Sequence, residues 1–594
     1  MTQPTLLPDT GTPVESSTPR PGSRADRMSM PIAKDVLRRV AEEARVCVRP
    51  LAIRRTDTET GRADIINVPC GARLASKCKP CAERNRRLRI QQIREGWHLA
   101  EEPTVAPERP ADDVIGLVST RAHLEFDRAD LMTQRMEPEQ RQAELEAIDE
   151  AIQEIDEELA TCRVRGKLVD CRDGKKPLSR STRRRADAVE LPRLPVENRT
   201  VGRTYAAKEG KTLRPSTLLT ITLGSHGQVH TGARTRRGRL HPCECGTLHG
   251  QRDPVLGTPI DPNGYDYRQA AVDAIHFAAV LDRFWQNLRR AVGWKVQYAG
   301  AVELQKRLAP HAHFAVRGTM ARKLMRQVAA ATYHQVWWPS FERMVYGVDR
   351  PPVWDAEIAS YVDPKTNEPL PTWDQAIDGT TEEGAEPACV IRLGKVDPRG
   401  ITPGTKDAER SIRYVTKYLT KDLAEHAAPS SEAQQAHFDR LHSELSILPC
   451  SPTCANWLLY GVQPDKAKAG LVPGRCKGKV HQRHTLGFTG RRVLVSRQWS
   501  GKTLADHRAD NRDWIRTVLS GALAEGDTPD AMPGAKYTFE LARPDDPDVP
   551  SIRVRILRSI AERQRWRAQL HQLQHDPPTV SANQINNSSS GEEQ

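Results

Sequence analysis

A short apolar segment with two closely spaced histidines constrains the fold of this chain more than any other feature. Residues 303–317 read Glu-Leu-Gln-Lys-Arg-Leu-Ala-Pro-His-Ala-His-Phe-Ala-Val-Arg. Because side chains alternate along a strand, a strand here points His311 and His313 to the same side. The pattern predicts two antiparallel strands, at 295–305 and 311–317, joined by a turn.

A third metal ligand is expected from the first of these two strands. Glu303 lies eight residues before His311, so the turn would set its carboxylate beside the histidine pair. Two neutral imidazoles and one carboxylate make a divalent-metal site with open positions. The other interpretation of Glu303 is a surface glutamate on an edge strand.

Two tyrosines follow further along the chain, each with a lysine three residues on. Residues 414–421 read Tyr-Val-Thr-Lys-Tyr-Leu-Thr-Lys, within a helix expected over 409–426. Tyr414 and Tyr418 are four residues apart, so they share one face of that helix. A metal ion beside a tyrosine nucleophile can cleave a phosphodiester and leave one end of the cut strand covalently bound to the tyrosine. The alternative for Tyr414 is packing against the sheet.

Taken in this order, the motifs resemble those of HUH endonucleases. An apolar segment at 218–223, Leu-Leu-Thr-Ile-Thr-Leu, precedes the histidines and resembles the first motif of that family. Within the group, roughly residues 217–422 are similar to the rolling-circle replication initiators of actinobacterial plasmids. The two cysteine-rich flanks also resemble theirs. The tyrosine segment further resembles that of the initiators of isometric single-stranded DNA phages, which carry two active tyrosines at this spacing.

The resemblance implies an α+β fold: an HUH nuclease core with an antiparallel sheet and flanking helices, plus zinc-binding modules and a helical-hairpin insertion. It implies Tyr418 as the first nucleophile and Tyr414 as the second, with Glu303 completing a Mg²⁺ or Mn²⁺ site. Lys417 and Lys421 would lower the cost of deprotonating the phenols. The expected partners are plasmid origin DNA and single-stranded DNA. The expected products are a 5′-phosphotyrosine and a free 3′-hydroxyl.

No nucleotide-binding loop accompanies these motifs. Gly501-Lys502-Thr503 lacks the upstream glycine of a Walker A motif, because Ser496 occupies that position. Unwinding is therefore expected to depend on a separate host helicase.

The twelve cysteines favour metal sites over disulfides, because the N-terminus has no secretory h-region. Two sets predict structural zinc: Cys47, Cys70, Cys78 and Cys81, and then Cys450, Cys454, Cys476 and His481. A third set could bind zinc or be an unmetallated loop: Cys243, Cys245 and His249, with His241 or Asp253 as the fourth ligand. The remaining cysteines are expected to be ordinary thiols: Cys162, Cys171 and Cys389.

The charge balance indicates a polyanionic partner. The net charge is +13 and the pI is about 9.2. The first cysteine set leads into a basic helix, which is expected to contact DNA phosphates through Arg84, Arg86, Arg87 and Arg89. No run of 18 apolar residues exists, so no membrane span is expected. These features predict a cytoplasmic protein, and the resemblance implies a bacterial one.

The chain length predicts several domains. The expected divisions are a disordered N-terminus (1–30), a Cys₄ zinc module with the basic helix (31–113), a helical or coiled-coil insertion (114–200), the HUH endonuclease domain (210–430), a second zinc module (431–515), a C-terminal segment (516–576) and a disordered tail (577–594). Residues 138–161 carry an apolar stripe with steps of three and four, which favours a solvated hairpin over a dimerisation arm. Further helices are expected over 268–292 and 320–346.

Two other functions remain open at this point. A relaxase or a single-strand transposase would use the same chemistry, although relaxases usually place the tyrosine ahead of the histidines. A non-catalytic, zinc-dependent DNA-binding regulator would account for the charge and the cysteines. It would leave the glutamate, the two histidines and the two tyrosines without a role.

Overall fold

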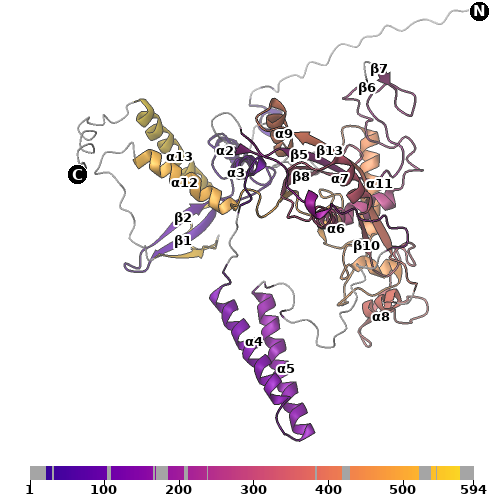
Figure 1. Ribbon diagram of the computed structural model, residues 1–594. Helices are drawn as coiled ribbons and strands as arrows, with labels where there is room; N and C mark the ends of the chain where they lie inside the picture. The colour runs from indigo at the N-terminus through magenta and orange to yellow at the C-terminus, as the bar shows by residue number, and fades with distance from the viewer. Residues whose placement is uncertain are drawn as a thin grey trace, which may run out of the picture. The chain divides into compact units, whose positions relative to one another are not determined.

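The computed structural model describes residues 20, 22–29, 33–103, 109–162, 164, 168, 185–206, 212–236, 239–381, 384–417, 428–520, 537–543 and 545–575 (Figure 1). The chain divides into two compact units. Unit 1 takes residues 1–92, 416–425 and 503–594, and unit 2 takes residues 93–415 and 426–502. Helices and antiparallel sheets are mixed in both.

A six-stranded antiparallel sheet forms the core of unit 2. Its strand order is β10-β13-β5-β9-β8-β14. These strands are β5 (Ser216–Leu223), β8 (Tyr298–Leu304), β9 (Pro310–Arg317), β10 (Tyr333–Val336), β13 (Cys389–Ile401) and β14 (Val493–Val495). The strands predicted at 218–223, 295–305 and 311–317 are confirmed as β5, β8 and β9.

The two faces of this sheet differ in character. On one face, the long helix α6 (Tyr267–Val292) packs its fully buried Trp285 flat against Tyr298 of β8, with ring centroids 3.8 Å apart. The same indole meets Phe314 of β9 edge-on. Because side chains alternate, the neighbours of Phe314 along β9 point away from α6. His311 and His313 therefore lie on the opposite face of the sheet.

The segment after β9 differs from its predicted structure. A single helix was expected over 320–346, but α7 (Arg322–Ala330) ends early and β10 follows it at once. Strand β10 pairs antiparallel with β13. Its sequence, Tyr-His-Gln-Val, has an aromatic and a β-branched residue, which favour a strand once a partner strand is available. The prediction of one continuous helix was wrong for this reason.

The stripe at 138–161 forms one arm of a helical hairpin. Helices α4 (Asp112–Leu131) and α5 (Pro138–Thr161) contact each other along their length (Figure 1). Arg121 of α4 pairs with Asp156 of α5 at 2.8 Å. Ile152 and Leu159 of the predicted stripe are buried.

Unit 1 joins the two ends of the chain, an association that the sequence did not predict. A three-stranded sheet has the order β15-β1-β2. Its strands are β1 (Leu51–Asp57), β2 (Ala63–Val68) and β15 (Tyr537–Leu541), and the helices are α2 (Ala33–Glu43), α3 (Lys79–Trp97, which continues into unit 2), α12 (Leu504–Ser520) and α13 (Ile552–His575). Ile556 and Ile560 of α13 share a buried cluster with Ala41 of α2 and Cys78.

Further α-helices and strands lie among the described residues, beside four short 3-10 helices. They are α1 (Arg24–Ser29), β3 (Tyr205–Ala206), β4 (Thr212–Leu213), β6 (Arg234–Arg236), β7 (Arg239–His241), β11 (Val353–Asp355), β12 (Ser360–Val362), α8 (Trp373–Asp378), α9 (Lys406–Thr416) and α11 (Glu432–Ile447). Among the described residues, no helix combines the length and the apolar character needed to cross a membrane.

Candidate functional site

The sheet register brings the predicted glutamate and histidines together. Glu303 of β8 lies opposite His311 of β9. The Nε2 atoms of His311 and His313 are 2.9 Å apart, and Glu303 Oε1 lies 3.4 Å from His313 Nε2. One ligand atom from each of the three residues lies within 4.8 Å of the others. These residues are called the Glu-His-His cluster below.

A threonine on the neighbouring strand orients His313. Thr220 of β5 lies opposite His313, and its Oγ1 is 2.9 Å from the histidine Nδ1. In the tautomer that directs the Nε2 lone pair into the cluster, Nδ1–H donates to this hydroxyl oxygen. Such partners fix the ring of a metal-binding histidine. Thr220 was not singled out from the sequence, although it lies in the 218–223 motif.

The electrostatics of the cluster suit a metal ligand. The side chains of Glu303 and His313 are each 7% exposed. Burial lowers the pKa of His313 to about 4, so the ring is neutral at physiological pH. A ligating imidazole has to be neutral. One carboxylate and two imidazoles therefore converge as a donor set that fits a divalent cation.

One of the predicted tyrosines lies at this cluster. Helix α9 buries Ala408, Ile412 and Val415 and leaves Tyr414 39% exposed. The Tyr414 hydroxyl oxygen is 2.9 Å from His313 Nε2, and the two rings meet edge-on with centroids 4.8 Å apart. The phenol is thus next to the ligand atoms while remaining accessible from outside.

The other residues of the tyrosine segment are described only in part. Lys417 follows α9 and is exposed. Tyr418 and Lys421 lie outside the described residues.

Four cysteines of unit 1, here called the Cys₄ cluster, come together as the sequence predicted: Cys47, Cys70, Cys78 and Cys81. The sulfur atoms of Cys47 and Cys78 are 3.8 Å apart. Two thiolates on a tetrahedral zinc, each at ~2.3 Å, are separated by about this distance. The backbone N–H groups of Arg49 and Cys70 both donate to Cys47 Sγ at 3.4 Å, which stabilises a thiolate. This cluster could hold structural zinc.

The second predicted set, here called the Cys₃His cluster, also converges: Cys450, Cys454, Cys476 and His481. Cys454 Sγ lies 3.6 Å from His481 Nε2. His481 Nδ1 is 2.6 Å from the Leu445 carbonyl oxygen, so Nδ1–H donates there and Nε2 faces the sulfur atoms. Gly478 packs tightly against them: a Cβ on it would lie 2.8 Å from Cys450 Sγ. Zinc could also be held here.

A third set, here called the His₂Cys₂ cluster, has a different fourth member from those considered in the sequence: His230, Cys243, Cys245 and His249. His230 Nδ1 lies 3.2 Å from His249 Nε2, so it takes the place for which His241 or Asp253 was considered. Asp253 instead accepts a hydrogen bond from His249 Nδ1–H at 2.7 Å. The spacing of His230, thirteen residues before Cys243, is no local zinc signal.

The thiol chemistry of the His₂Cys₂ cluster is consistent with metal binding. Burial raises the pKa of Cys243. Hydrogen bonds from the backbone N–H groups of Cys245 and Thr231, together with the side chains of Cys245 and His230, outweigh burial and bring this pKa to about 6. A thiol with this pKa is largely thiolate at neutral pH, which is the form that binds zinc. None of the cysteines among the described residues forms a disulfide.

Comparison with known proteins identifies the kind of protein to which these sites belong. Residues 33–562 match the model of a family described as RepSA, the replication initiator protein of pSAM2. The match spans most of the 594 residues, so the chain belongs to this family of plasmid replication initiators. The resemblance to the initiators of actinobacterial plasmids is thereby confirmed. Comparison with curated proteins and with solved structures gave no match.

Proposed function

We propose that this replication initiator starts rolling-circle replication by nicking one strand of its plasmid origin at the Glu-His-His cluster. One observation carries the proposal: the Tyr414 hydroxyl oxygen lies 2.9 Å from His313 Nε2. Two histidines and a glutamate that only stabilised the fold would not need an accessible phenol beside them. A nuclease that forms a covalent link to DNA does need one.

The chemistry of the nick follows from the donor set. Glu303, His311 and His313 would hold Mg²⁺ or Mn²⁺, and the ion would supply Lewis-acid stabilisation of the charge that develops on the scissile phosphate. A tyrosine oxygen attacks the phosphorus, and the bond from phosphorus to the 3′ oxygen breaks. The leaving oxygen takes a proton and becomes the 3′-hydroxyl that primes synthesis. The 5′ end stays on the enzyme as a phosphotyrosine.

The proposed mechanism uses two tyrosines. An unperturbed phenol has a pKa near ~10, so attack requires help in losing the proton. Tyr418 would make the first nick, with Lys421 nearby in sequence. Tyr414, with Lys417, would make the second attack that ends the cycle. The contact between Tyr414 and His313 supports a chemical role for Tyr414 over simple packing. Because the phosphotyrosine link conserves the bond energy, religation needs no ATP.

The proposed function also involves structural metal ions, a DNA substrate and a second protein. The three Cys/His clusters would each hold a structural zinc ion. Origin DNA is the substrate, a separate host helicase unwinds it, and the cytoplasm is where we propose the reaction takes place. Family membership favours an initiator over a relaxase or a transposase. A non-catalytic regulator would not account for Tyr414 beside His313.

A covalent adduct assay tests this function. The full-length protein is incubated with Mn²⁺ and single-stranded DNA from its own replicon, and protein–DNA adducts are resolved on a denaturing gel. His311→Ala and His313→Ala should each abolish the adduct while circular dichroism stays unchanged. Glu303→Ala should be partly rescued by excess Mn²⁺. His123→Ala, an exposed histidine on α4, is the control and should react normally. Unchanged nicking by the His311→Ala/His313→Ala double variant would end the proposal.

A further inference from the structure

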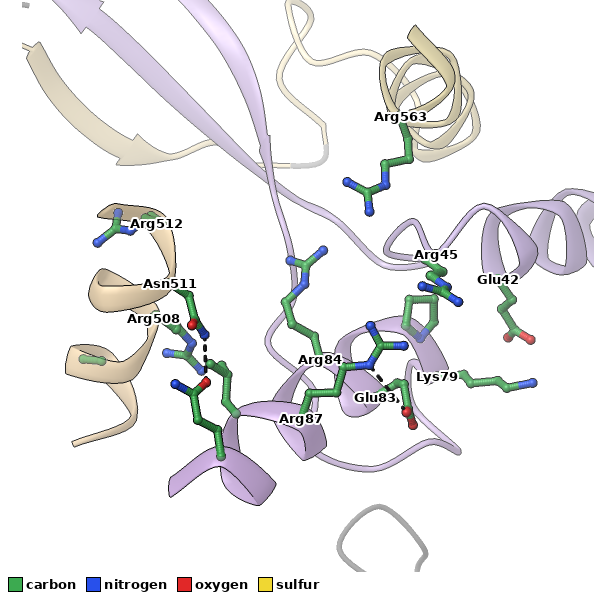
Figure 2. Close-up of a pocket in the computed structure, with 14 residues that line it drawn as sticks. Glu42, Arg45, Lys79, Glu83, Arg84, Arg87, Arg508, Asn511, Arg512 and Arg563 are labelled. Carbon is green, nitrogen blue, oxygen red and sulfur yellow. Dashed lines mark hydrogen bonds and ion pairs between the residues drawn. The ribbon is translucent and has the colours of Figure 1, made fainter. Parts of the chain in front are cut away.

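We infer that a basic groove in unit 1, built from both ends of the chain, binds the phosphate backbone of duplex DNA. This inference rests on the proposed function, because it assigns the duplex origin to a surface separate from the Glu-His-His cluster. The groove is a cavity of about 1120 Å³ between helices α3, α12 and α13 and the end of α2 (Figure 2). No role for α12 or α13 was evident from the sequence.

The lining of the groove is strongly cationic. Seven cationic side chains line it, against two carboxylates, Glu42 and Glu83. The cations come from separate segments: Arg45, Lys79, Arg84, Arg87, Arg508, Arg512 and Arg563. Like charges are gathered here at a cost in repulsion, and an anion in the groove would relieve it.

Three of these cations have no carboxylate partner in the part of the chain that the structure describes. Glu83 pairs with Arg86 at 3.3 Å and lies 3.9 Å from Arg87. No carboxylate among the described residues forms an ion pair with Arg84, Arg512 or Arg563. Burial, and then repulsion from neighbouring arginines that include Arg84 and Arg45, lower the pKa of Arg563. The charges of Arg84, Arg512 and Arg563 are therefore not balanced by a described carboxylate, and a bound anion would stabilise them.

The walls of the groove are held in place by contacts that also involve the Cys₄ cluster. Ile556 and Ile560 of α13 pack in the buried core that contains Cys78 and Cys81. Helix α12 is fastened to α3 by hydrogen bonds, of which one joins the Arg508 guanidinium to Asn85 Oδ1 at 2.9 Å. A second joins Asn511 to Gln91 at 3.0 Å. These contacts fix the helices that carry the cationic side chains of the groove.

The chemistry of the lining favours a duplex over a single strand. Sites for single strands combine cations with aromatic rings on which bases stack. The residues that line this groove, all within the described part of the chain, include no aromatic side chain. Arginine forks match phosphate oxygens, which the duplex backbone presents at regular spacing.

The structure reduces the number of arginines on the basic helix that we expect to contact DNA phosphates. Of its four arginines, Arg84 and Arg87 line the groove. Arg86 pairs with Glu83. Arg89 hydrogen-bonds Gln92, and burial lowers its pKa to about 10. We therefore expect phosphate contacts from only two of these four arginines.

The test measures duplex binding of the full-length, zinc-loaded protein by fluorescence anisotropy over 50–200 mM salt. The groove variant combines Arg84→Ala, Arg512→Ala and Arg563→Ala, one change from each of three helices. The control combines Arg553→Ala, Arg558→Ala and Arg565→Ala, which remove the same charge from exposed positions of α13 outside the groove. A lysine version of the groove variant restores charge at the same three positions and checks the fold.

Each phosphate contact contributes ~0.9 to the slope of log affinity against log salt. The groove variant should therefore lose about 2.7 from the slope, so that wild type loses ~40-fold more affinity than the variant across this salt range. The control and the lysine version should keep slopes close to that of wild type. Adduct formation with a short single strand should be unchanged in all variants. If wild-type protein also forms no adduct, the proposed nuclease is wrong. The duplex affinities still test the groove in that case, because they do not depend on cleavage. Equal slopes for groove and control variants, or a loss confined to single-stranded DNA or RNA, would overturn the inference.

Discussion

The hydrogen bond between Thr220 and His313 offers a fine test of the candidate metal site. Thr220→Val keeps the shape of the side chain and removes only the hydroxyl that lies 2.9 Å from His313 Nδ1. A hydrogen bond of this kind contributes about 0.5–1.5 kcal/mol. The loss of a partner that orients a metal ligand typically costs ~10–100-fold in metal affinity, or ~1.4–2.7 kcal/mol. Because His313 is buried, we expect a tenfold or larger rise in the Mn²⁺ concentration needed for half-maximal adduct formation.

The same strand supplies a matched control. Thr222 lies two residues on, opposite His311, but its hydroxyl donates to the carbonyl oxygen of Lys395 at 2.8 Å. Thr222→Val therefore removes an equivalent hydroxyl without touching a ligand. Adduct formation is titrated with Mn²⁺ for wild type and both variants. If Thr220→Val follows the wild-type curve, or if both variants shift equally, Thr220 does not orient His313 for metal binding.

Three further outcomes are expected. Gly478→Ala should cost on the order of 1–3 kcal/mol through its clash with Cys450 Sγ and should speed zinc loss to a chelator; Gly400→Ala, which meets no atom within 4 Å, should not. Burial lowers the pKa of His276 to about 3 and that of His437 to about 4. Between pH ~4 and ~6.5 the unfolded chain therefore binds more protons than the folded protein. The free energy of unfolding should fall as pH is lowered through that window. His437→Gln should flatten this dependence in denaturant titrations, and an unchanged slope would contradict the assignment. Stripping zinc from the Cys₄ cluster should make α13 sensitive to limited proteolysis, and full protection would contradict the packing described for unit 1.

The parts of the fold that the sequence predicted are those with a local signal. The resemblance of 218–223 to a core strand predicted β5, and alternation within 311–317 predicted β9. The short interval between Glu303 and His311 predicted that β8 and β9 pair across a turn. The cysteine spacings likewise predicted two of the three Cys/His clusters.

The parts that the sequence missed depend on contacts between distant segments. Thr220 meets His313 only because β5 and β9 pair in one register. His230 is brought to Cys243 by a loop whose spacing carries no zinc signal. Ile556 packs beside Cys78 across most of the chain length, so neither segment alone predicts unit 1. The helix expected over 320–346 was wrong because pairing with β13 outweighs local helix propensity at Tyr333–Val336.

The most direct test of the proposed nuclease is to locate the DNA on the protein. Trypsin cleaves after Arg413, Lys417 and Lys421, so the two tyrosines fall on separate peptides, Tyr-Val-Thr-Lys and Tyr-Leu-Thr-Lys. Mass spectrometry of the Mn²⁺-dependent adduct, after nuclease trimming, should find the nucleotide on Tyr418 in the first turnover and on Tyr414 once strand transfer proceeds. Tyr414→Phe should still nick but leave the protein attached to the 5′ end, and Tyr333→Phe should behave as wild type. Full termination by Tyr414→Phe would limit the mechanism to one tyrosine. An adduct that persists in the Tyr414→Phe/Tyr418→Phe double variant, or that maps to neither peptide, would contradict the account.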